Sequence, residues 1–356
     1  MKQVKRLGVI ECSGTSYEIG QQYGQAAKEN IKHSIDVLIQ RVNSSAKATK
    51  DEILKNTRKY QPYVKKVDPI LIEQIRGQAD GAGVTFDEVF ALRCWFELRF
   101  HYKHLVTLCT SFAATGTATK GGRTLVGQNF DVPPGSTLDI VRIKRDDGSK
   151  ELSLVFWGGG ELSINSYGIG LVLNVVASPD ADQRLCIPCC CLMPKVMREH
   201  RMGDALGTLC THGRSMLHYM IGSSEGEIFS VETRPDNFNV IQPVEDFLVH
   251  TNHYITENFK IGDAKGLPTR GGSYLRQQRL TRLMKGAHGE ITPESMMEFM
   301  SDHHNYPVAI CGHPNEEVPP DQRSMTVSSI IMVPEEKCMY VTFGNPCQYE
   351  YEKYTL

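Results

Sequence analysis

The segment Leu108-Cys109-Thr110-Ser111-Phe112 marks the point where the character of this 356-residue chain changes. Residues before it follow helical patterns, and residues after it form short β-rich runs separated by turn signals. About twenty residues later, Gly127-Gln128-Asn129-Phe130-Asp131 places a carboxylate at the end of the next predicted strand. Antiparallel neighbours face each other across about 5 Å. We therefore expect Asp131 to lie beside Cys109.

The residues before this segment predict a series of helices. Four helix starts are indicated by capping-box spacings or an Asp-Pro pair, at Thr15, Thr49, Asp68-Pro69 and Thr85. Apolar residues recur on one face from Ile19 to Val42, which predicts a single helix there. The helix that follows Pro69 is expected to end at Gly81 and Gly83. The last helix should run to Trp95.

After Cys109, strands and helical pairs alternate. Strands are predicted at residues 123–130, 139–144, 152–157, 170–176, 217–221, 228–232, 247–250, 325–333 and 338–343. Helices are predicted at residues 188–212, 273–285 and 293–303. Groups of strands interrupted by helical pairs are typical of layered sandwiches of sheets and helices. No stretch has the composition of a linker, so residues 1–356 are expected to form one domain.

The composition excludes several classes of function. The formal net charge is −2 and no basic stripe is present, which argues against nucleic acid as a partner. No apolar run reaches about 18 residues, so no membrane span is predicted. The basic start, Met1 to Arg6, leads into no apolar segment of a secretory signal. The 11 cysteines are irregularly spaced, which is unlike a disulfide framework. A cytoplasmic location is the prediction.

Cys109 and Asp131 together suggest nucleophilic chemistry. A thiol at the first position of a chain can use its own α-amino group as base, because that amine has a pKa of about 8. A neighbouring carboxylate can hold the amine in place and tune its charge. The alternative is that Cys109 is a small buried hydrophobe, which is the common role of a lone cysteine in a strand.

Further motifs follow in a fixed order along nearly the whole chain. They are Gly14–Gly20, Cys109-Thr110, Gly127–Asp131, Asn165–Gly170, Gly226–Glu232, Thr251–Tyr254, Ser273 with Arg276 and Arg279, Asp302-His303, and Ile310–Pro314. Each is weak alone. In this order and spacing they resemble the penicillin acyltransferase (acyl-CoA:6-aminopenicillanate acyltransferase) family of Ntn hydrolases. One departure is Leu108, which is bulkier than the small residue that precedes the nucleophile in that family.

The resemblance implies an α+β fold, the four-layer αββα sandwich of Ntn hydrolases. It also implies self-cleavage between Leu108 and Cys109, which leaves a helical fragment 1–108 and a catalytic fragment 109–356 that stay associated. Cys109 would then cleave or transfer an acyl group from a linear amide or thioester through a thioester acyl-enzyme. The substrate would be a small molecule, with no cofactor and no metal, and a homo-oligomer is compatible with this assignment.

The resemblance also assigns roles to further residues. Asp131 would position the amine of Cys109, and the side chain of Asn252 would donate to the oxyanion. A backbone N–H near Asn165 would be a second donor. Two further roles are suggested by the residues themselves. Phe130 is a candidate wall of the substrate pocket. Ser273 with Arg276 and Arg279 could bind a substrate carboxylate, and the alternative is that the two arginines form surface ion pairs.

Several other interpretations stay open at this stage. An uncleaved, catalytically silent member of the fold would be a small-molecule binding protein. His253 could replace the amine as base. The segment Asp302-His303-His304, with Cys311 and His313, has the composition of a metal site, although a structural loop is favoured. The cysteines at 186, 189, 190 and 191 are expected to pack in the core, because three adjacent cysteines cannot all reach one ion.

Overall fold

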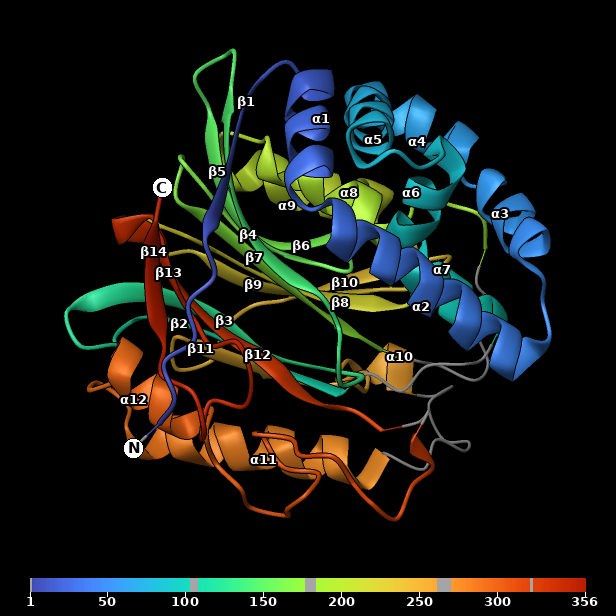
Figure 1. The fold of residues 1–356 in the computed structure, drawn as a ribbon. Coiled ribbons are helices and arrows are strands. Elements are labelled where there is room, and N and C mark those ends of the chain that lie inside the picture. Colours follow the sequence, from blue (N-terminus) through green and yellow to red (C-terminus); the bar gives the residue numbers. More distant parts are fainter. Residues whose placement is uncertain (1, 103–107, 177–183, 261–269, 321–322) are drawn as a thin grey trace.

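Two β-sheets lie face to face between two layers of helices (Figure 1). The computed structural model describes residues 2–102, 108–176, 184–260, 270–320 and 323–356. Both sheets bury their inner faces, and the larger hydrophobic core extends from the first helices through both sheets. This arrangement confirms the α+β class and the four-layer αββα sandwich predicted from the sequence.

The larger sheet has eight strands. In spatial order they are β1 (Val9–Gly14), β4 (Leu138–Arg145), β5 (Lys150–Phe156), β6 (Gly160–Asn165), β7 (Ile169–Val175), β8 (Leu217–Ser223), β9 (Ile228–Thr233) and β10 (Phe238–Ile241). The pairing of β1 with β4 is parallel, and the other pairings are antiparallel. The N-terminal segment therefore contributes an edge strand to a sheet built mostly from later residues.

The smaller sheet has six strands and contains Cys109. Its order is β11 (Phe247–His250), β2 (Leu108–Gly116), β3 (Gly122–Val132), β12 (Met325–Val333), β13 (Cys338–Val341) and β14 (Glu352–Thr355). All of its pairings are antiparallel. The short helix η2 (Pro334–Glu336) turns the chain from β12 into β13.

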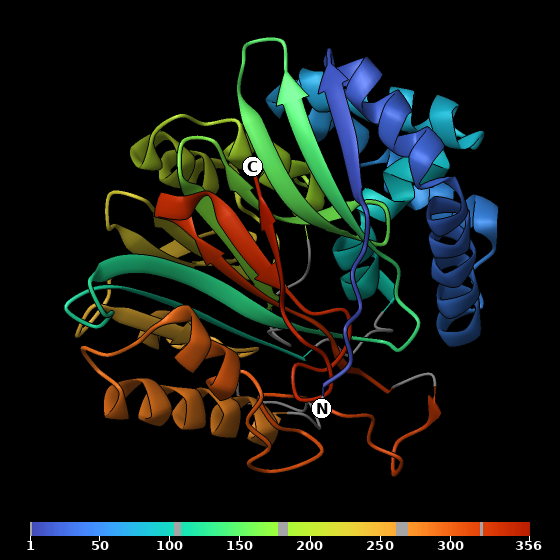
Figure 2. The same ribbon diagram turned by 60° about the vertical axis from the view of Figure 1, so that its left-hand side comes forward.

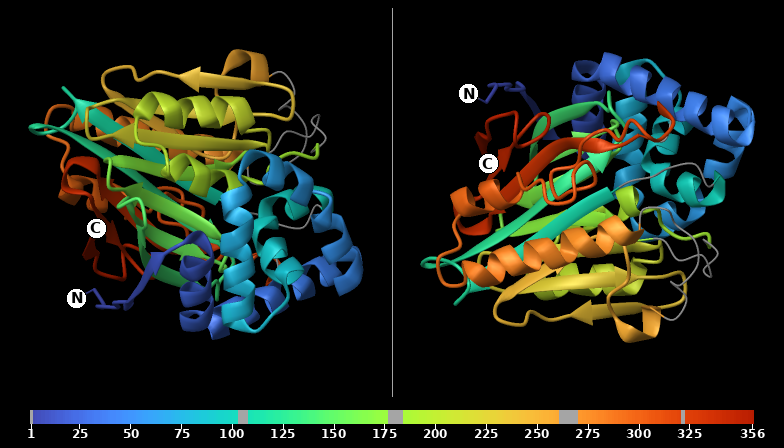
Figure 3. Two further views of the ribbon diagram at one scale, coloured as in Figure 1. Left: turned by 90° about the horizontal axis from the view of Figure 1, so that it is seen from above. Right: turned by 90° about the horizontal axis from the view of Figure 1, so that it is seen from below.

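The helices form the two outer layers (Figure 2). The helical layer on the side of the larger sheet contains α1 (Ser16–Ala26), α2 (Lys28–Ala46), α3 (Lys50–Arg58), α4 (Gln61–Val67), α5 (Pro69–Ala82), α6 (Phe86–Arg93), α7 (Trp95–Tyr102), α8 (Cys189–Met197) and α9 (Met202–His212). On the smaller sheet lie α11 (Arg270–Gly286) and α12 (Pro293–Phe299), and α10 (Glu257–Lys260) is a single turn after β11. In the views from above and below, α11 runs along the outside of the smaller sheet (Figure 3).

The observed helix starts match those predicted from the sequence, but one predicted helix is divided into two in the structure. Capping boxes are present at Thr15, Thr49 and Thr85, each with both reciprocal hydrogen bonds. The single helix expected from Ile19 to Val42 is wrong, because the chain breaks at Ala27, where φ is −99° and ψ is 17°. Among the described helices, none combines the length and apolar character that crossing a membrane requires.

Candidate active site

Cys109 is the second residue of β2, a strand with partners on both sides. Its Cα lies opposite that of Phe130 on β3, and β11 flanks β2 on the other side. Directly opposed residues of an antiparallel pair point to the same face, and successive residues point to opposite faces. The Cys109 side chain therefore shares a face with Phe130, whereas Leu108 shares the other face with Asp131. Cys109 is 1 % exposed.

The main chain of Cys109 is held on both sides by side chains from distant segments. Its N–H donates to Oδ1 of Asn252 at 2.8 Å. Its carbonyl oxygen accepts from Nη1 of Arg276 at 2.6 Å, and the same nitrogen donates to the hydroxyl of Thr110. Arg276 also donates from Nη2 to Oδ1 of Asn252 at 2.8 Å. The peptide at Cys109 is thereby fixed by one amide and one guanidinium, both at least partly buried.

Burial dominates the electrostatics of the thiol. It raises the pKa of Cys109 to about 12, and the nearby carboxyl of Asp131 acts in the same direction. A hydrogen bond from the Asp131 backbone, the charge of Arg276 and the side chain of Gln128 oppose this rise. The thiol is therefore neutral near pH 7 in the uncut chain, and it would need a base before it could attack.

Asp131 was expected beside Cys109; the register places it one residue away, opposite Leu108, so its side chain lies on the other face of the sheet from the thiol. Its side chain is buried, and its Oδ1 accepts from the hydroxyl of Thr326 on β12 at 2.6 Å. Burial raises the pKa of Asp131 to about 7, and the charge of Arg276 and the Thr326 bond oppose that rise. Two ionisable groups with strongly shifted pKa values in one place are typical of functional sites.

The position of Asn252 is fixed by α11. The backbone N–H of Asn252 donates to the Ser273 hydroxyl at 2.9 Å. That hydroxyl also contacts Thr251 Oγ1 at 3.0 Å and Nδ1 of His253 at 2.8 Å. The second end of the Asn252 amide, Nδ2, donates to the carbonyl of Val175, the last residue of β7, at 3.0 Å. Asn252 therefore links the two sheets at the end of β11.

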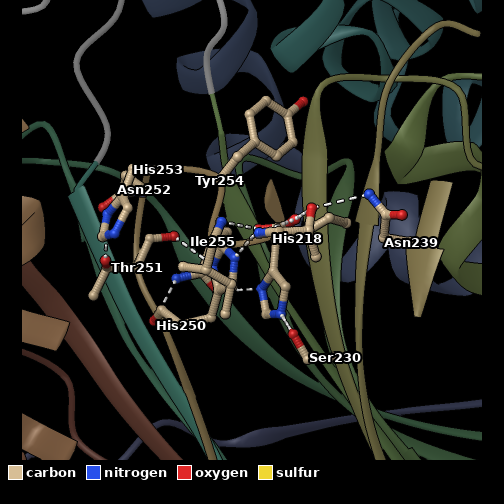
Figure 4. A network of polar contacts seen from close by, with 12 residues as sticks. His218, Ser230, Asn239, His250, Thr251, Asn252, His253, Tyr254 and Ile255 are labelled. Atoms are coloured by element: carbon tan, nitrogen blue, oxygen red, sulfur yellow. Dashed lines mark hydrogen bonds and ion pairs between the residues drawn. The ribbon is translucent and has the colours of Figure 1, made fainter. Parts of the chain in front are cut away.

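A buried polar network supports the turn that carries Asn252 (Figure 4). Glu232 on β9 accepts from Nε2 of His250 at 2.8 Å and from the backbone N–H of Ile255 at 2.6 Å. His250 stacks on His218 with ring centroids 3.6 Å apart. Burial alone would raise the pKa of Glu232, but the hydrogen bonds from His250 and Thr256 keep it below its ordinary value. A carboxylate thus holds both ends of the segment 250–255.

His253 does not have the properties of a general base. Burial, together with the neighbouring charges of His250 and Arg276, lowers its pKa to about 3. Its Nδ1 is engaged with Ser273, and its ring lies against Tyr274 at 3.9 Å. The geometry therefore favours a supporting role for His253.

Phe130 belongs to an aromatic cluster on the same face as the thiol. Its ring centroid lies 4.6 Å from that of Phe156 and 5.8 Å from that of Trp157. Trp157 in turn stacks on Trp95 of α7 at 4.2 Å. The side of Cys109 that faces the larger sheet is therefore apolar, as the wall of an acyl pocket would be.

Three of the predicted substrate-binding residues have structural partners. The amide of Asn165 donates to the carbonyls of Met197 and Glu199 and accepts from the backbone N–H groups of Tyr167 and Ile169. It anchors the turn after β6, on the larger sheet. Ser273 and Arg276 do meet at the site, but they bind the protein's own Asn252 and Cys109. Arg279, predicted alongside them, pairs with Asp302 at 2.6 Å.

Sequence reasoning missed Thr326, Gln128 and Glu232 as supports of the site. Gln128 shares the face of the thiol and accepts from the backbone N–H of Leu173 at 3.0 Å. Gln128 stands in a motif already singled out, and its place two residues from Phe130 on one strand face was a usable signal. Glu232 also ends a motif already singled out, Gly226–Glu232, but nothing in that motif indicated its contacts with the segment 250–255. No signal marked Thr326, whose contact with Asp131 depends on sheet packing.

Comparison with known proteins identifies the family of this chain. Residues 117–348, more than half of the chain, match the model of the family described as acyl-coenzyme A:6-aminopenicillanic acid acyl-transferase. The two stacked sheets between helical layers define an αββα sandwich. The chain belongs to this acyltransferase family, as the sequence resemblance had indicated. The match begins eight residues after Cys109.

A similar protein of Emericella nidulans is the 40 kDa form of an acyl-coenzyme A:6-aminopenicillanic-acid-acyltransferase. It is 24 % identical over 310 residues, which cover 85 % of this chain and 84 % of the relative. Among solved structures, a mutant of the conjugated bile acid hydrolase of Clostridium perfringens matches with a TM-score of 0.46 and 14 % identity, covering 70 % of this chain and 97 % of that one. Penicillin V acylase of Agrobacterium tumefaciens matches with a TM-score of 0.44 and 14 % identity, covering 66 % and 83 %.

Proposed function

We propose that this protein is a self-cleaving cysteine amidase or acyltransferase in which Cys109 is the nucleophile. The observation that carries the proposal is the clamped peptide at Cys109. Its N–H and its carbonyl are each bound by a side chain, while its thiol shares a face with an aromatic cluster. A buried structural cysteine needs no such fixation of its own backbone. Membership of an acyltransferase family supports the same chemistry.

In the first step, Sγ of Cys109 attacks the carbonyl carbon of Leu108. The S–C bond forms, the C–N bond breaks, and the thiol proton moves to the released nitrogen. Water then hydrolyses the thioester, which gives the carboxylate of Leu108 and restores the thiol. The products are fragments 1–108 and 109–356, and Cys109 now carries a free α-amino group.

In the mature enzyme, that amine is the base. It is attached to the same Cα as the thiol, and its ordinary pKa of about 8 is close to working pH. Asp131 lies opposite the position that Leu108 occupied, so its carboxylate is placed to hold the amine. The thiol attacks an amide or thioester, forms an acyl-enzyme, and passes the acyl group to water or an amine.

Asn252 has the donor that the tetrahedral intermediate requires. Each side-chain amide nitrogen offers two N–H groups. In the described part of the chain Nδ2 of Asn252 bonds to Val175 alone, so its second N–H can serve an oxyanion. The Oδ1 end holds the nitrogen of Cys109. One amide therefore fixes the base and stabilises the developing charge.

Intact mass is the direct test. Wild-type protein should give two masses, corresponding to residues 1–108 and 109–356, and Cys109→Ala should give one full-length chain. Cys338→Ala removes a buried cysteine on β13 and is the matched control, which should still be cleaved.

Two outcomes would contradict the proposal. Cleavage of Cys109→Ala at the same bond would show that the thiol is not the nucleophile. A wild-type chain that stays intact and turns over no N-acyl amino acid, peptide or acyl thioester would favour a silent binding protein.

A further inference from the structure

Four side chains from the C-terminal part of the sequence bring potential metal-ligand atoms together outside the proposed catalytic site. They are His303, Cys311, His313 and Cys347, and all four ligand atoms lie within 4.8 Å of one another. Two thiols and two imidazoles form the donor set of many structural zinc sites. We infer that these residues bind one Zn²⁺ ion in a tetrahedral Cys₂His₂ site.

The distances between the ligand atoms match the edges of such a tetrahedron. Zinc–sulfur bonds of about 2.3 Å and zinc–nitrogen bonds of about 2.05 Å imply S···S, S···N and N···N edges of about 3.8, 3.6 and 3.3 Å. In the structure, the sulfurs of Cys311 and Cys347 are 3.6 Å apart. The Nε2 atom of His313 lies 3.7 Å from the first sulfur and 3.5 Å from the second. The two Nε2 atoms of His303 and His313 are 3.1 Å apart.

The alternatives to a metal explain this cluster poorly. A disulfide needs its sulfurs at about 2.05 Å, and both cysteines are free at 3.6 Å. Two imidazole nitrogens at 3.1 Å can share only one hydrogen bond, and the two sulfurs are weak partners for them. A soft divalent cation would satisfy all four atoms at once.

The ligands come from two segments that the fold brings together. His303, Cys311 and His313 lie in the loop between α12 and β12, and Cys347 lies between β13 and β14. From the sequence, the first three residues together with Asp302 and His304 have the composition of a metal site, although a structural loop was the favoured interpretation. Cys347 was missed, because its distance along the chain fits no zinc-finger spacing. His304 is outside the cluster, although it is the neighbour of a ligand.

The geometry indicates a structural ion and not a catalytic one. Four protein ligands complete a tetrahedron, so no position stays open for water or substrate. The amide of Asn345 donates to the sulfur of Cys311 at 3.5 Å and to the carbonyl of Gly312 at 2.7 Å. Such outer hydrogen bonds orient the ligands of metal sites. The ion would therefore fasten the loop to the C-terminal segment.

The fastened loop also touches the proposed catalytic site. The N–H of Gly312, between two of the ligands, donates to the Thr326 hydroxyl at 2.8 Å. That hydroxyl donates to the carboxyl of Asp131 at 2.6 Å. Gly312, which lies between the ligands Cys311 and His313 in the sequence, is thus linked to Asp131 through the single side chain of Thr326. This link depends on the proposed function, whereas metal binding itself does not.

Metal content of tag-free protein is the first test. We expect about one zinc per chain by elemental analysis, both in wild type and in Cys109→Ala, because binding does not require cleavage. Protein that has been reduced, stripped with a chelator and titrated with Co²⁺ should develop the visible bands of a tetrahedral thiolate site. Zn²⁺ should then abolish these bands.

Two ligand variants with matched controls assign the site. Loss of an outer hydrogen bond weakens metal binding by about 10–100-fold, so loss of a direct ligand should weaken it by at least about 100-fold. His303→Ala and Cys347→Ser should show this loss. His304→Ala and Cys210→Ser alter residues of the same types outside the cluster and should bind Co²⁺ as wild type does.

Three results would overturn the inference. The first is reduced wild-type protein that binds neither zinc nor cobalt. The second is binding that survives in both ligand variants, and the third is iron as the bound metal. Thermal unfolding of each variant shows whether it is folded, and the wild-type cobalt titration decides the question without any variant.

Discussion

At the scale of single residues, mutation of Asn252 tests whether its side chain has the proposed role of oxyanion donor or is only part of a turn. Loss of an oxyanion donor should lower kcat by about 10²–10³ with little change in KM. Because self-cleavage passes through a similar intermediate, its rate should fall as well. The assay is Asn252→Ala, with the cleavage rate measured by mass and turnover measured on the cleaved fraction.

The matched control is Asn258→Ala, which alters an exposed asparagine on the neighbouring α10. If Asn252→Ala cleaves and turns over as fast as this control, Asn252 is a structural turn residue. A lower melting temperature of Asn252→Ala without a loss of cleavage rate or turnover would lead to the same conclusion.

Asp131 should give the uncut chain a characteristic pH dependence. Burial raises its folded pKa to about 7, whereas an unfolded aspartate has a pKa of about 3.9. Between about pH 4 and pH 7 the carboxyl of Asp131 is protonated in the folded state and ionised in the unfolded state. The free energy of unfolding therefore falls as the pH rises through this interval. Above about pH 7 its effect is constant. Cys109→Ala is the background, because it is expected to stay uncut.

The measurement compares Cys109→Ala with Cys109→Ala/Asp131→Asn by urea unfolding at several pH values. The asparagine cannot lose a proton, so its stability relative to aspartate should improve from about pH 4 to about pH 7 and then level off. The pH-independent part of the difference in unfolding free energy also contains the lost attraction to Arg276. The informative quantity is therefore the change of that difference with pH. A flat difference, or one of opposite sign, would contradict the raised pKa.

Individual residues of the site differed in how far the sequence could identify them. A hairpin brings its two strands together, so Cys109 and Asp131 were predicted as neighbours, but the sequence did not fix the exact register, in which Asp131 faces Leu108. The role of Arg276 could not be predicted, since it depends on α11 reaching across β2 to the carbonyl of Cys109. Side chains that bind backbone groups of distant segments leave no local pattern.

At the scale of elements, Ser273 should connect α11 to the end of β11. Its hydroxyl contacts the backbone of Asn252 and the side chains of Thr251 and His253. Ser273→Ala leaves these buried groups with fewer partners, which should cost about 1–3 kcal/mol of stability. It should also lower kcat, but less than Asn252→Ala does, because the donor itself remains.

The control for this prediction is Ser301→Ala, because the Ser301 hydroxyl lies just beyond the end of α12 and donates only to the carbonyl of Met297 in that helix among the described residues. Chemical unfolding and steady-state rates of both variants decide the question. Equal kcat values in the two variants would show that Ser273 does not position Asn252.

Elements with strong local signals were predicted closely, and those defined by their partners were not. β11 and β12 have the bounds expected from their apolar runs. β1, β6, β10 and β14 were missed. β6 begins at Gly160, the last residue of the run Gly158-Gly159-Gly160, whose composition is typical of a turn, and it is a strand because it pairs with β5. The break at Ala27 is equally invisible, since α1 and α2 both keep their apolar faces toward the core.

At the scale of the whole molecule, the two expected fragments are interleaved rather than adjacent. Fragment 1–108 contributes β1 to the larger sheet, where it pairs with β4 of fragment 109–356. Trp95 stacks on Trp157 across the same boundary. Glu97 accepts hydrogen bonds from the backbone of Cys189 and the hydroxyl of Ser215. After cleavage the fragments should therefore elute together in size exclusion, and they should separate only in denaturant.

A fully buried polar link between the fragments is the ion pair of Arg93 and Glu161. The two side chains are 1 % and 6 % exposed and are joined at 2.8 Å. Removing one partner of a buried pair leaves an uncompensated charge, which typically costs about 3–5 kcal/mol. Replacing both partners by neutral groups costs much less. Arg93→Met should therefore destabilise the chain strongly, and Arg93→Met/Glu161→Gln should recover most of the loss.

Urea unfolding of these variants in the uncut Cys109→Ala background measures the energies without interference from fragment dissociation. In the cleavable chain, the same order should appear as the denaturant concentration at which the fragments separate. Arg76→Met is the matched control, because Arg76 forms an exposed pair with Glu73 inside one fragment. An Arg93→Met variant as stable as this control would mean that the buried pair does not hold the fragments together. Association would then rest on the strand pairing and the aromatic contacts alone.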